Sequence, residues 1–341
     1  MTSVGLAEIP QSVSWDGDHT KTPPVQLNGE FEESLSGTAQ PEFAHFESCA
    51  TCSRDEELDA FSVGASVYFA KPHVKEAFQA NILNVQTGTS QLIPLDNDYQ
   101  ASPKLWIAYQ VNESFGVRAS YWQYDHQSTP FSQAATQTQF PGANVVTIIF
   151  PATITTSAPG EVLRVDNSLK FETVDLEATM PIRLGSLQVT GGAGIRYASM
   201  MQSFNAIASG VFPTRSLNWT RDFEGTGLTM GADVRKPIIS GLSVIADAQL
   251  SLLFVEKKLN RSVIGDVTPN SPPANVTLDD ADEISATFEL GIGLEWKTAL
   301  TDQTDVFLQG KYESSIWTAA GQPTLSFLGF QGLTGTAGLN W

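Results

Sequence analysis

The sequence has few charged residues, few cysteines and no long apolar run. Only 16% of its 341 residues are charged, well below the roughly one quarter typical of soluble domains. No run of 18 or more apolar residues occurs, which excludes a membrane-spanning helix. The net charge of −18 argues against nucleic acid as a partner, because nucleic-acid binding relies on Lys and Arg that neutralise phosphates. Positions that are not apolar are mostly Gly, Ser, Thr, Gln and Ala, which favours a barrel with lipid outside and a small polar lumen.

Cysteine is scarce, and the two that occur, Cys49 and Cys52, are spaced C-x-x-C downstream of His45. A redox motif of this spacing normally opens a helix in a βαβ unit, and no such pattern surrounds it. A metal site needs more ligands than two Cys and one His. A local disulfide in an oxidising compartment, or an ordinary cysteine pair without a role, fits better. We therefore expect neither a metal site nor a cofactor.

The N-terminal part of the chain differs from the rest. Residues 1–57 are polar and acidic, with scattered Pro and no sustained period, so they predict a flexible extension. Residues 58–341 are predicted to form the folded domain. Met1–Pro10 shows neither a basic segment nor the apolar core of a secretory signal. Because an exported protein needs such a signal, we expect it to lie upstream of this start or to have been removed.

The acidic residues gather in the extension and in predicted loops. The clusters are Glu30, Glu32 and Glu33; Asp55, Glu56 and Glu57; Asp96 and Asp98; and Asp279, Asp280 and Asp282. Solvated surface is the simpler interpretation, and the alternative is a divalent cation bound by the last cluster, since hard cations require several oxygen ligands.

From Asp59 onward, apolar and polar residues alternate with period two, the pattern of β-strands with one apolar face. About ten such segments occur, and Leu242–Phe254 is the clearest. The segments cover 61–69, 103–111, 115–125, 174–180, 187–197, 228–235, 242–254, 284–296, 306–316 and 333–341.

The connections between these segments alternate between long and short, as in outer-membrane barrels with long extracellular loops and short periplasmic turns. Long loops are predicted at 70–101, 126–167, 199–221 and 256–282, and the first has room for another hairpin at 78–95. The predicted fold is all-β: a transmembrane antiparallel up-and-down β-barrel of about ten strands, within a range of 8–12. Aromatic residues at strand ends suggest interfacial girdles, with Trp296 and Trp341 on the periplasmic side and Phe69, Tyr121, Phe254 and Trp317 on the outer side.

The last predicted strand ends on the final residue, Trp341, with Leu339 on the same apolar face. A free half-apolar edge invites aggregation, whereas in a closed barrel the last strand pairs with the first. We expect Leu339 and Trp341 to act as a terminal signal for the barrel assembly machinery.

Four stretches carry a resemblance to a known family. They read KLWIAYQ with FGVRASYWQYDH, DLEATMPIRLGSLQVTGGAGIRYASMMQSFNA, FEGTGLTMGADVRKPIISGLSVIADAQLSLLF, and VFLQGKYESSIW. Their order and spacing resemble the Legionella-type major outer membrane protein family, also described as pore-forming outer membrane proteins and common in planctomycetes. The resemblance covers residues 58–341. It implies a barrel in the outer membrane, lipid around it and a porin-like role, and it supplies no catalytic residues.

Charged residues on the polar face of the predicted strands should line the lumen. The acids are Asp175, Glu177, Asp233, Asp247, Glu289, Glu295 and Glu313, and the bases are Arg118, Arg196, Arg235 and Lys311. Either they brace the barrel as salt bridges or they form a polar path for solutes. The acid excess, 7 − 4 = 3, predicts a mild preference for cations. A barrel of about ten strands predicts a lumen that is narrow or occluded.

Passive passage of small hydrophilic solutes or ions is therefore the predicted function. One alternative is a non-conducting structural or adhesive barrel, in which loop 126–167 contacts a partner. Another is an outer-membrane hydrolase using His126, which follows Tyr124 and Asp125. No Gly-x-Ser-x-Gly elbow supports that alternative, so we do not expect an enzyme. The sequence makes no prediction of oligomeric state.

Overall fold

The computed structural model describes residues 60–74, 79–84, 87–95, 98–136, 144–148, 154–156, 158–264, 274–318 and 327–341. All of them belong to one compact unit, 55–341. The predicted extension and the pair Cys49 and Cys52 lie outside the described residues, so the extension and the disulfide stay predictions. Within the described ranges, no helix is long and apolar enough to cross a membrane.

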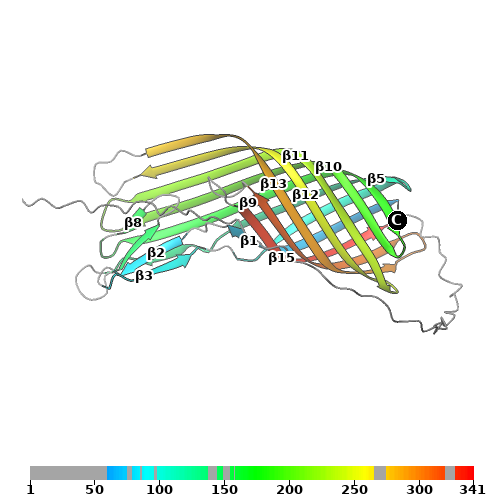
Figure 1. Cartoon of the computed structure of the whole chain (residues 1–341). Helices are drawn as coiled ribbons and strands as arrows, with labels where there is room; N and C mark the ends of the chain where they lie inside the picture. The colour runs from blue at the N-terminus through cyan, green and yellow to red at the C-terminus, as the bar shows by residue number, and fades with distance from the viewer. Residues whose placement is uncertain are drawn as a thin grey trace, which may run out of the picture. The chain divides into compact units, whose positions relative to one another are not determined.

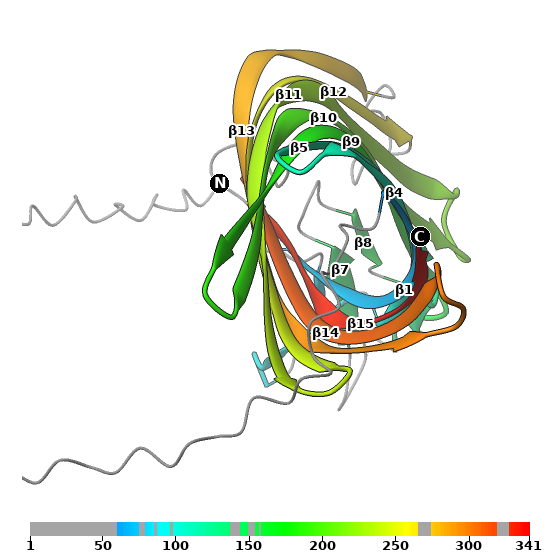
Figure 2. The ribbon, with the colours of Figure 1, turned by 90° about the vertical axis from the view of Figure 1, so that its right-hand side faces the viewer.

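Ten antiparallel strands close into a barrel, seen from the side in Figure 1 and along its length in Figure 2. In order around the barrel they are β1 (Phe61–Val74), β4 (Gln100–Asn112), β5 (Phe115–Gln127), β9 (Val162–Leu184), β10 (Leu187–Ser209), β11 (Arg215–Ile239), β12 (Leu242–Ile264), β13 (Ala274–Ala299), β14 (Asp305–Thr318) and β15 (Phe327–Asn340). The last strand returns to the first, with Ser62 opposite Asn340 and Val74 opposite Leu328. The predicted all-β barrel of about ten strands is confirmed.

The two ends of the barrel differ in their connections. At one end, here called the turn end, adjacent strands are joined by a few residues, as between β9 and β10 or between β11 and β12. Gly185 and Gly241 lie in these two turns with φ of 63° and 75°, a conformation that other residues adopt with strain. The opposite end, the loop end, carries the longer connections, except that five residues join β10 to β11.

The predicted long loops 199–221 and 256–282 are mostly strand. β10 continues to Ser209 and β11 begins at Arg215, while β12 continues to Ile264 and β13 begins at Ala274, so both predicted loops are wrong. β9 likewise begins at Val162, inside the predicted loop 126–167. The physical reason is that the alternation continues but its polarity reverses. Leu163 and Leu169 face inward and are buried, while Arg164 and Lys170 on the same strand point outward. Because the strands were predicted from their outward apolar residues, the predicted strands end where this reversal begins.

A second sheet lies against the loop end of the long strands (Figure 1). It contains β2 (Gln79–Asn84), β3 (Ser90–Pro94), β7 (Asn144–Ile148) and β8 (Ile154–Thr156), and the short β6 (Phe131–Ala134) pairs with β9. Its apolar residues pack on the inward face of β9 to β11 in one buried cluster. The cluster includes Ala80, Val146, Ile154, Leu163, Val165, Phe204, Leu217 and Trp219. The hairpin suggested at 78–95 is therefore present as β2 and β3, which pair.

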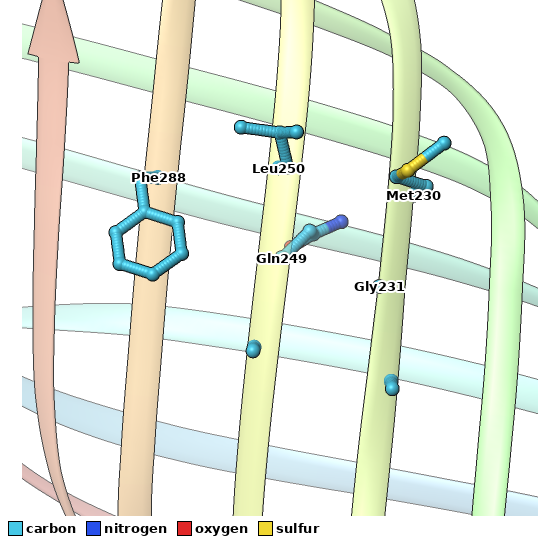
Figure 3. A pocket seen from close by; sticks show the side chains of 7 residues that line it. Met230, Gly231, Gln249, Leu250 and Phe288 are labelled. Atoms are coloured by element: carbon cyan, nitrogen blue, oxygen red, sulfur yellow. The ribbon is translucent and has the colours of Figure 1, made fainter. Parts of the chain in front are cut away.

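Nearer the turn end, the exposed face of the barrel is apolar. On β9, Val174, Leu176, Met180 and Leu184 are exposed, whereas the alternating inward residues from Thr173 to Thr179 are buried. The stretch from Val174 to Leu184 matches the roughly 9–11 residues of a tilted membrane-crossing strand. Figure 3 shows the same surface on β11, β12 and β13, where Met230, Leu250 and Phe288 lie on adjacent strands around a shallow depression. Such a band is stable only against lipid or an equivalent apolar surface.

The C-terminal residue closes the seam between the first and last strands. The Trp341 N–H donates to the Phe61 carbonyl oxygen at 2.9 Å, and the Phe61 N–H donates to the Trp341 carbonyl oxygen at 2.8 Å. The centroids of the Phe61 and Trp341 rings lie 4.4 Å apart.

We expect deletion of Trp341 to reduce the amount of protein inserted into the membrane more than it alters the folded barrel. The deletion removes the ring contact and both seam hydrogen bonds, while the other strand pairs remain. Heat-modifiable migration on gels of isolated membranes measures the inserted fraction. Trp296→Ala, which removes another exposed aromatic of the turn end, is the control. Normal insertion of the deletion variant contradicts the predicted signal.

Candidate functional site: the lumen

A layer of charged side chains crosses the lumen toward the turn end. Arg196 on β10 donates from Nε to Asp175 Oδ1 at 2.6 Å and from Nη2 to Asp175 Oδ2 at 2.7 Å. The same guanidinium donates to Gln249 Oε1 at 2.7 Å and pairs with Glu289. It is therefore held by residues of β9, β12 and β13. Arg196 is only 2% exposed, so water does not solvate its charge. The hydrogen bonds from these partners take the place of that solvation.

Arg118 on β5 holds a second part of the layer. Its Nε donates to Glu177 Oε2 at 2.9 Å, and its Nη1 donates to Asp233 Oδ2 at 2.5 Å. Gln249 links the two parts, because its Nε2 donates to Glu177 Oε1 at 3.2 Å. The bonds from Arg118 to β11 and from Gln249 to β9 each bypass two intervening strands, so the layer links non-adjacent strands across the interior.

The other predicted lumen residues are paired as well. Lys311 contacts Asp247 at 2.9 Å and Glu313 at 3.1 Å, and Arg235 contacts Glu295 at 2.7 Å. All eleven residues predicted to line the lumen thus lie on inward positions and form ion pairs. Their role in solute passage stays a prediction.

Two members of the layer were missed from the sequence. Lys104 on β4 pairs with Glu313, and Gln249 connects the Arg196 guanidinium with the Glu177 carboxylate. The sequence contained a signal for Lys104. Leu105 belongs to the apolar face of its strand, so the adjacent Lys104 must lie on the polar face. With Lys104 included, the acid excess of the layer becomes 7 − 5 = 2.

Toward the loop end, the charged layer gives way to a layer of aromatic rings. Phe171 on β9 and Trp317 on β14 have ring centroids 4.7 Å apart. In the closed order, four strands separate β9 from β14 in either direction, so these rings meet across the full width of the barrel. Trp122 and Tyr124 pack on Phe330 at 5.0 and 5.2 Å. Aromatic rings therefore span the lumen at this level.

The aromatic layer corrects one sequence prediction. Trp317 was expected in an outer girdle, but it faces inward and is fully buried. The alternation already contained the signal, because Ile316 faces outward and its neighbour must therefore face inward. Of the other predicted girdle residues, Phe69, Phe254, Trp296 and Trp341 are exposed as expected.

The structure places His126, the residue of the hydrolase alternative, on β5 inside the barrel. His126 is an inward, largely buried residue whose ring lies 6.2 Å from that of Tyr124. In the ranges that the structure describes, no group of three or more His, Cys, Asp or Glu residues is arranged to hold a metal ion. The side chains of Asp279, Asp280 and Asp282 lie outside the described part, and the expectation that the protein is not an enzyme stays a prediction.

The chain is similar to several solved outer-membrane proteins, at low sequence identity. The outer membrane protease OmpT from Escherichia coli is 13% identical, with 83% of this chain and 96% of that chain covered and a TM-score of 0.42. The translocator domain of the autotransporter NalP from Neisseria meningitidis is 10% identical, with 84% and 89% covered and a TM-score of 0.33. The attachment invasion locus protein Ail of Yersinia pestis is 11% identical, with 83% and 99% covered and a TM-score of 0.25. Scores this low carry no argument about activity.

No curated protein matches the sequence. The family model described as Legionella pneumophila major outer membrane protein precursor matches residues 54–326, most of the chain. The match agrees with the closed barrel and its apolar outer band, while the planctomycete detail stays a prediction. The chain belongs to the Legionella major outer membrane protein family and is a β-barrel of the outer membrane.

Proposed function

We propose that this barrel passes small hydrophilic solutes or ions through a narrow polar lumen that opens only when the aromatic layer moves. The observation that carries the proposal is the charged layer, which lines the interior of the apolar-walled barrel from β4 to β14. Several members have two charged partners, as Glu313 has in Lys104 and Lys311 and Arg196 has in Asp175 and Glu289. Partner exchange of this kind lets a polar solute enter without leaving a charge unpaired.

The side chains of the layer differ in how accessible they are. Arg196, Glu177 and Glu295 are almost fully buried, while the side chains of Asp233 and Arg235 are 42% and 36% exposed. The buried members suit a fixed brace, and the exposed members suit contact with a solute. Since outer-membrane barrels have short periplasmic turns, we expect the accessible charges to face the periplasmic entrance.

We expect the refolded barrel to be weakly cation-selective, because acids exceed bases in the layer. Reversal potentials in a planar bilayer under a salt gradient measure this preference. Asp233→Asn should reduce the preference by removing an accessible negative charge. Asp166→Asn, on the outward face of β9 beyond the apolar band, should leave it unchanged. Firm anion selectivity of the unaltered protein contradicts the prediction.

A second candidate function is a non-conducting surface barrel, favoured by the ring contact between Phe171 and Trp317 that closes the lumen. In that case the wall formed by β9 to β13 and the second sheet serves to present a surface outside the membrane. Liposome swelling separates the two candidates. Flux of small sugars or ions supports passage, and its absence in a correctly folded protein supports the surface barrel.

A further inference from the structure

Lys104, a member of the charged layer, lies in a cage of two aromatic rings and a carboxylate, where the charged layer meets the aromatic layer. Its Nζ is 4.3 Å from the centre of the Tyr68 ring and 5.3 Å from that of the Trp122 ring. The same ammonium pairs with the Glu313 carboxylate. Two ring faces and a carboxylate around one position are the elements by which proteins bind alkylammonium groups.

The walls of the cage are fixed independently of Lys104. The Trp122 Nε1–H donates to Ser102 Oγ at 3.0 Å, and the Ser102 hydroxyl donates to the Tyr68 carbonyl oxygen at 3.0 Å. The Tyr68 hydroxyl donates to the Glu313 carbonyl oxygen at 3.4 Å. All four wall residues are buried. The rings therefore keep their places when the ammonium leaves.

The occupant, by contrast, is held on a flexible arm. The side chain of Lys104 is 23% exposed, and its four-carbon stem can swing the ammonium away from the rings. The rings and the carboxylate are fixed, and the Lys104 ammonium between them can move. An external cation of the same chemistry can therefore take the place of the ammonium.

The local charges agree with one exchangeable monovalent cation. Lys104 and Lys311 balance Asp247 and Glu313, which are joined to them by ion pairs. Withdrawal of the Lys104 ammonium leaves one net negative charge beside the rings. A single external cation restores neutrality, whereas an anion or a divalent ion does not.

We propose that Tyr68, Trp122 and Glu313 form a binding site for a compact monovalent cation of the alkylammonium class, which Lys104 occupies itself. The inference deepens the proposed function, because a cation that crosses the lumen meets this site between the two layers. Binding does not depend on conduction, so the two can fail separately.

The test is tetramethylammonium binding to the refolded full chain in detergent micelles, measured by calorimetry and by tryptophan fluorescence. Lys104→Ala should bind at least tenfold more tightly than the unaltered protein. Lys104→Gln, which keeps most of the length without the charge, is measured alongside in case the smaller side chain disturbs folding. Adding Glu313→Gln to Lys104→Ala should remove most of the gain. Lys170→Ala, which removes an outward charge, should behave like the unaltered protein.

Each outcome decides between the site and its absence. The site is overturned if the unaltered protein and both Lys104 variants bind tetramethylammonium equally. It is also overturned if none of them binds while heat-modifiable migration shows that the barrels are folded. Equal binding of choline and its neutral analogue 3,3-dimethylbutanol by Lys104→Ala also overturns it, because the cage then selects shape and not charge. Binding without bilayer conductance leaves the site in place and refutes the proposed passage.

Discussion

Phe171→Ala is expected to raise the single-channel conductance of the refolded barrel several-fold. The Phe171 ring meets Trp317 across the full width of the lumen, so its removal takes away one half of that closure. The ring also contacts Trp122 and Phe330 at 5.2 and 5.3 Å. A gap at Phe171 therefore loosens the aromatic layer at several contacts at once.

Trp317→Ala should have a similar effect, since it removes the other half of the contact. Current recordings in planar bilayers at one salt concentration measure both variants. The matched control is Phe254→Ala, because Phe254 is 69% exposed on the outer wall and its loss leaves the interior unchanged. If both lumen variants are folded and conduct no more than this control, the aromatic layer is not the barrier, and the surface-barrel function is favoured.

Arg196→Met is expected to lower the free energy of unfolding by about 3–5 kcal/mol, the usual cost of removing one partner from a buried ion pair. The substitution leaves Asp175 and Glu289 without their shared cation inside the barrel. It also removes the donor to Gln249, which ties β10 to β12. Urea titration of the protein folded in lipid, followed by tryptophan fluorescence, measures the change.

The comparison for this variant is Arg164→Met, because the Arg164 side chain is 59% exposed and its ion pair with Asp166 lies on the outer face. Exposed pairs contribute about 0–1 kcal/mol, so little change is expected there. Combining Arg196→Met with Asp175→Asn and Glu289→Gln should recover part of the loss, since the uncompensated charges are then gone. A single variant as stable as the unaltered barrel shows that the charged layer does not brace it.

The strands that cross the membrane were readable from the sequence, because lipid requires every outward residue to be apolar while the lumen tolerates polar ones. This contrast marked Val174–Met180 and Leu242–Phe254 as strands and assigned each residue to a face. It also placed Arg118, Arg196 and Glu313 inside. Pairing was harder to read, since alternation says which face a residue occupies and nothing about its partner.

The parts beyond the apolar band were not readable by the same rule. There water lies outside and an apolar cluster inside, so the polarity of the alternation reverses and β9, β10 and β11 resemble loops to a search for outward apolar residues. The second sheet could not be predicted for a related reason. Its apolar residues are buried only by packing on the inward face of those long strands, which the sequence did not reveal.

By itself, the sequence determined the fold class, a count of about ten barrel strands and the face of most residues in the membrane-crossing segments, since those follow from period-two patterning against lipid. Only the tertiary structure decided that aromatic rings span the lumen. Phe171 and Trp317 are far apart in the chain, and their contact depends on barrel closure, which brings β9 and β14 to opposite walls a few side chains apart. The cage around Lys104 likewise joins β1, β4, β5 and β14, which no local pattern connects.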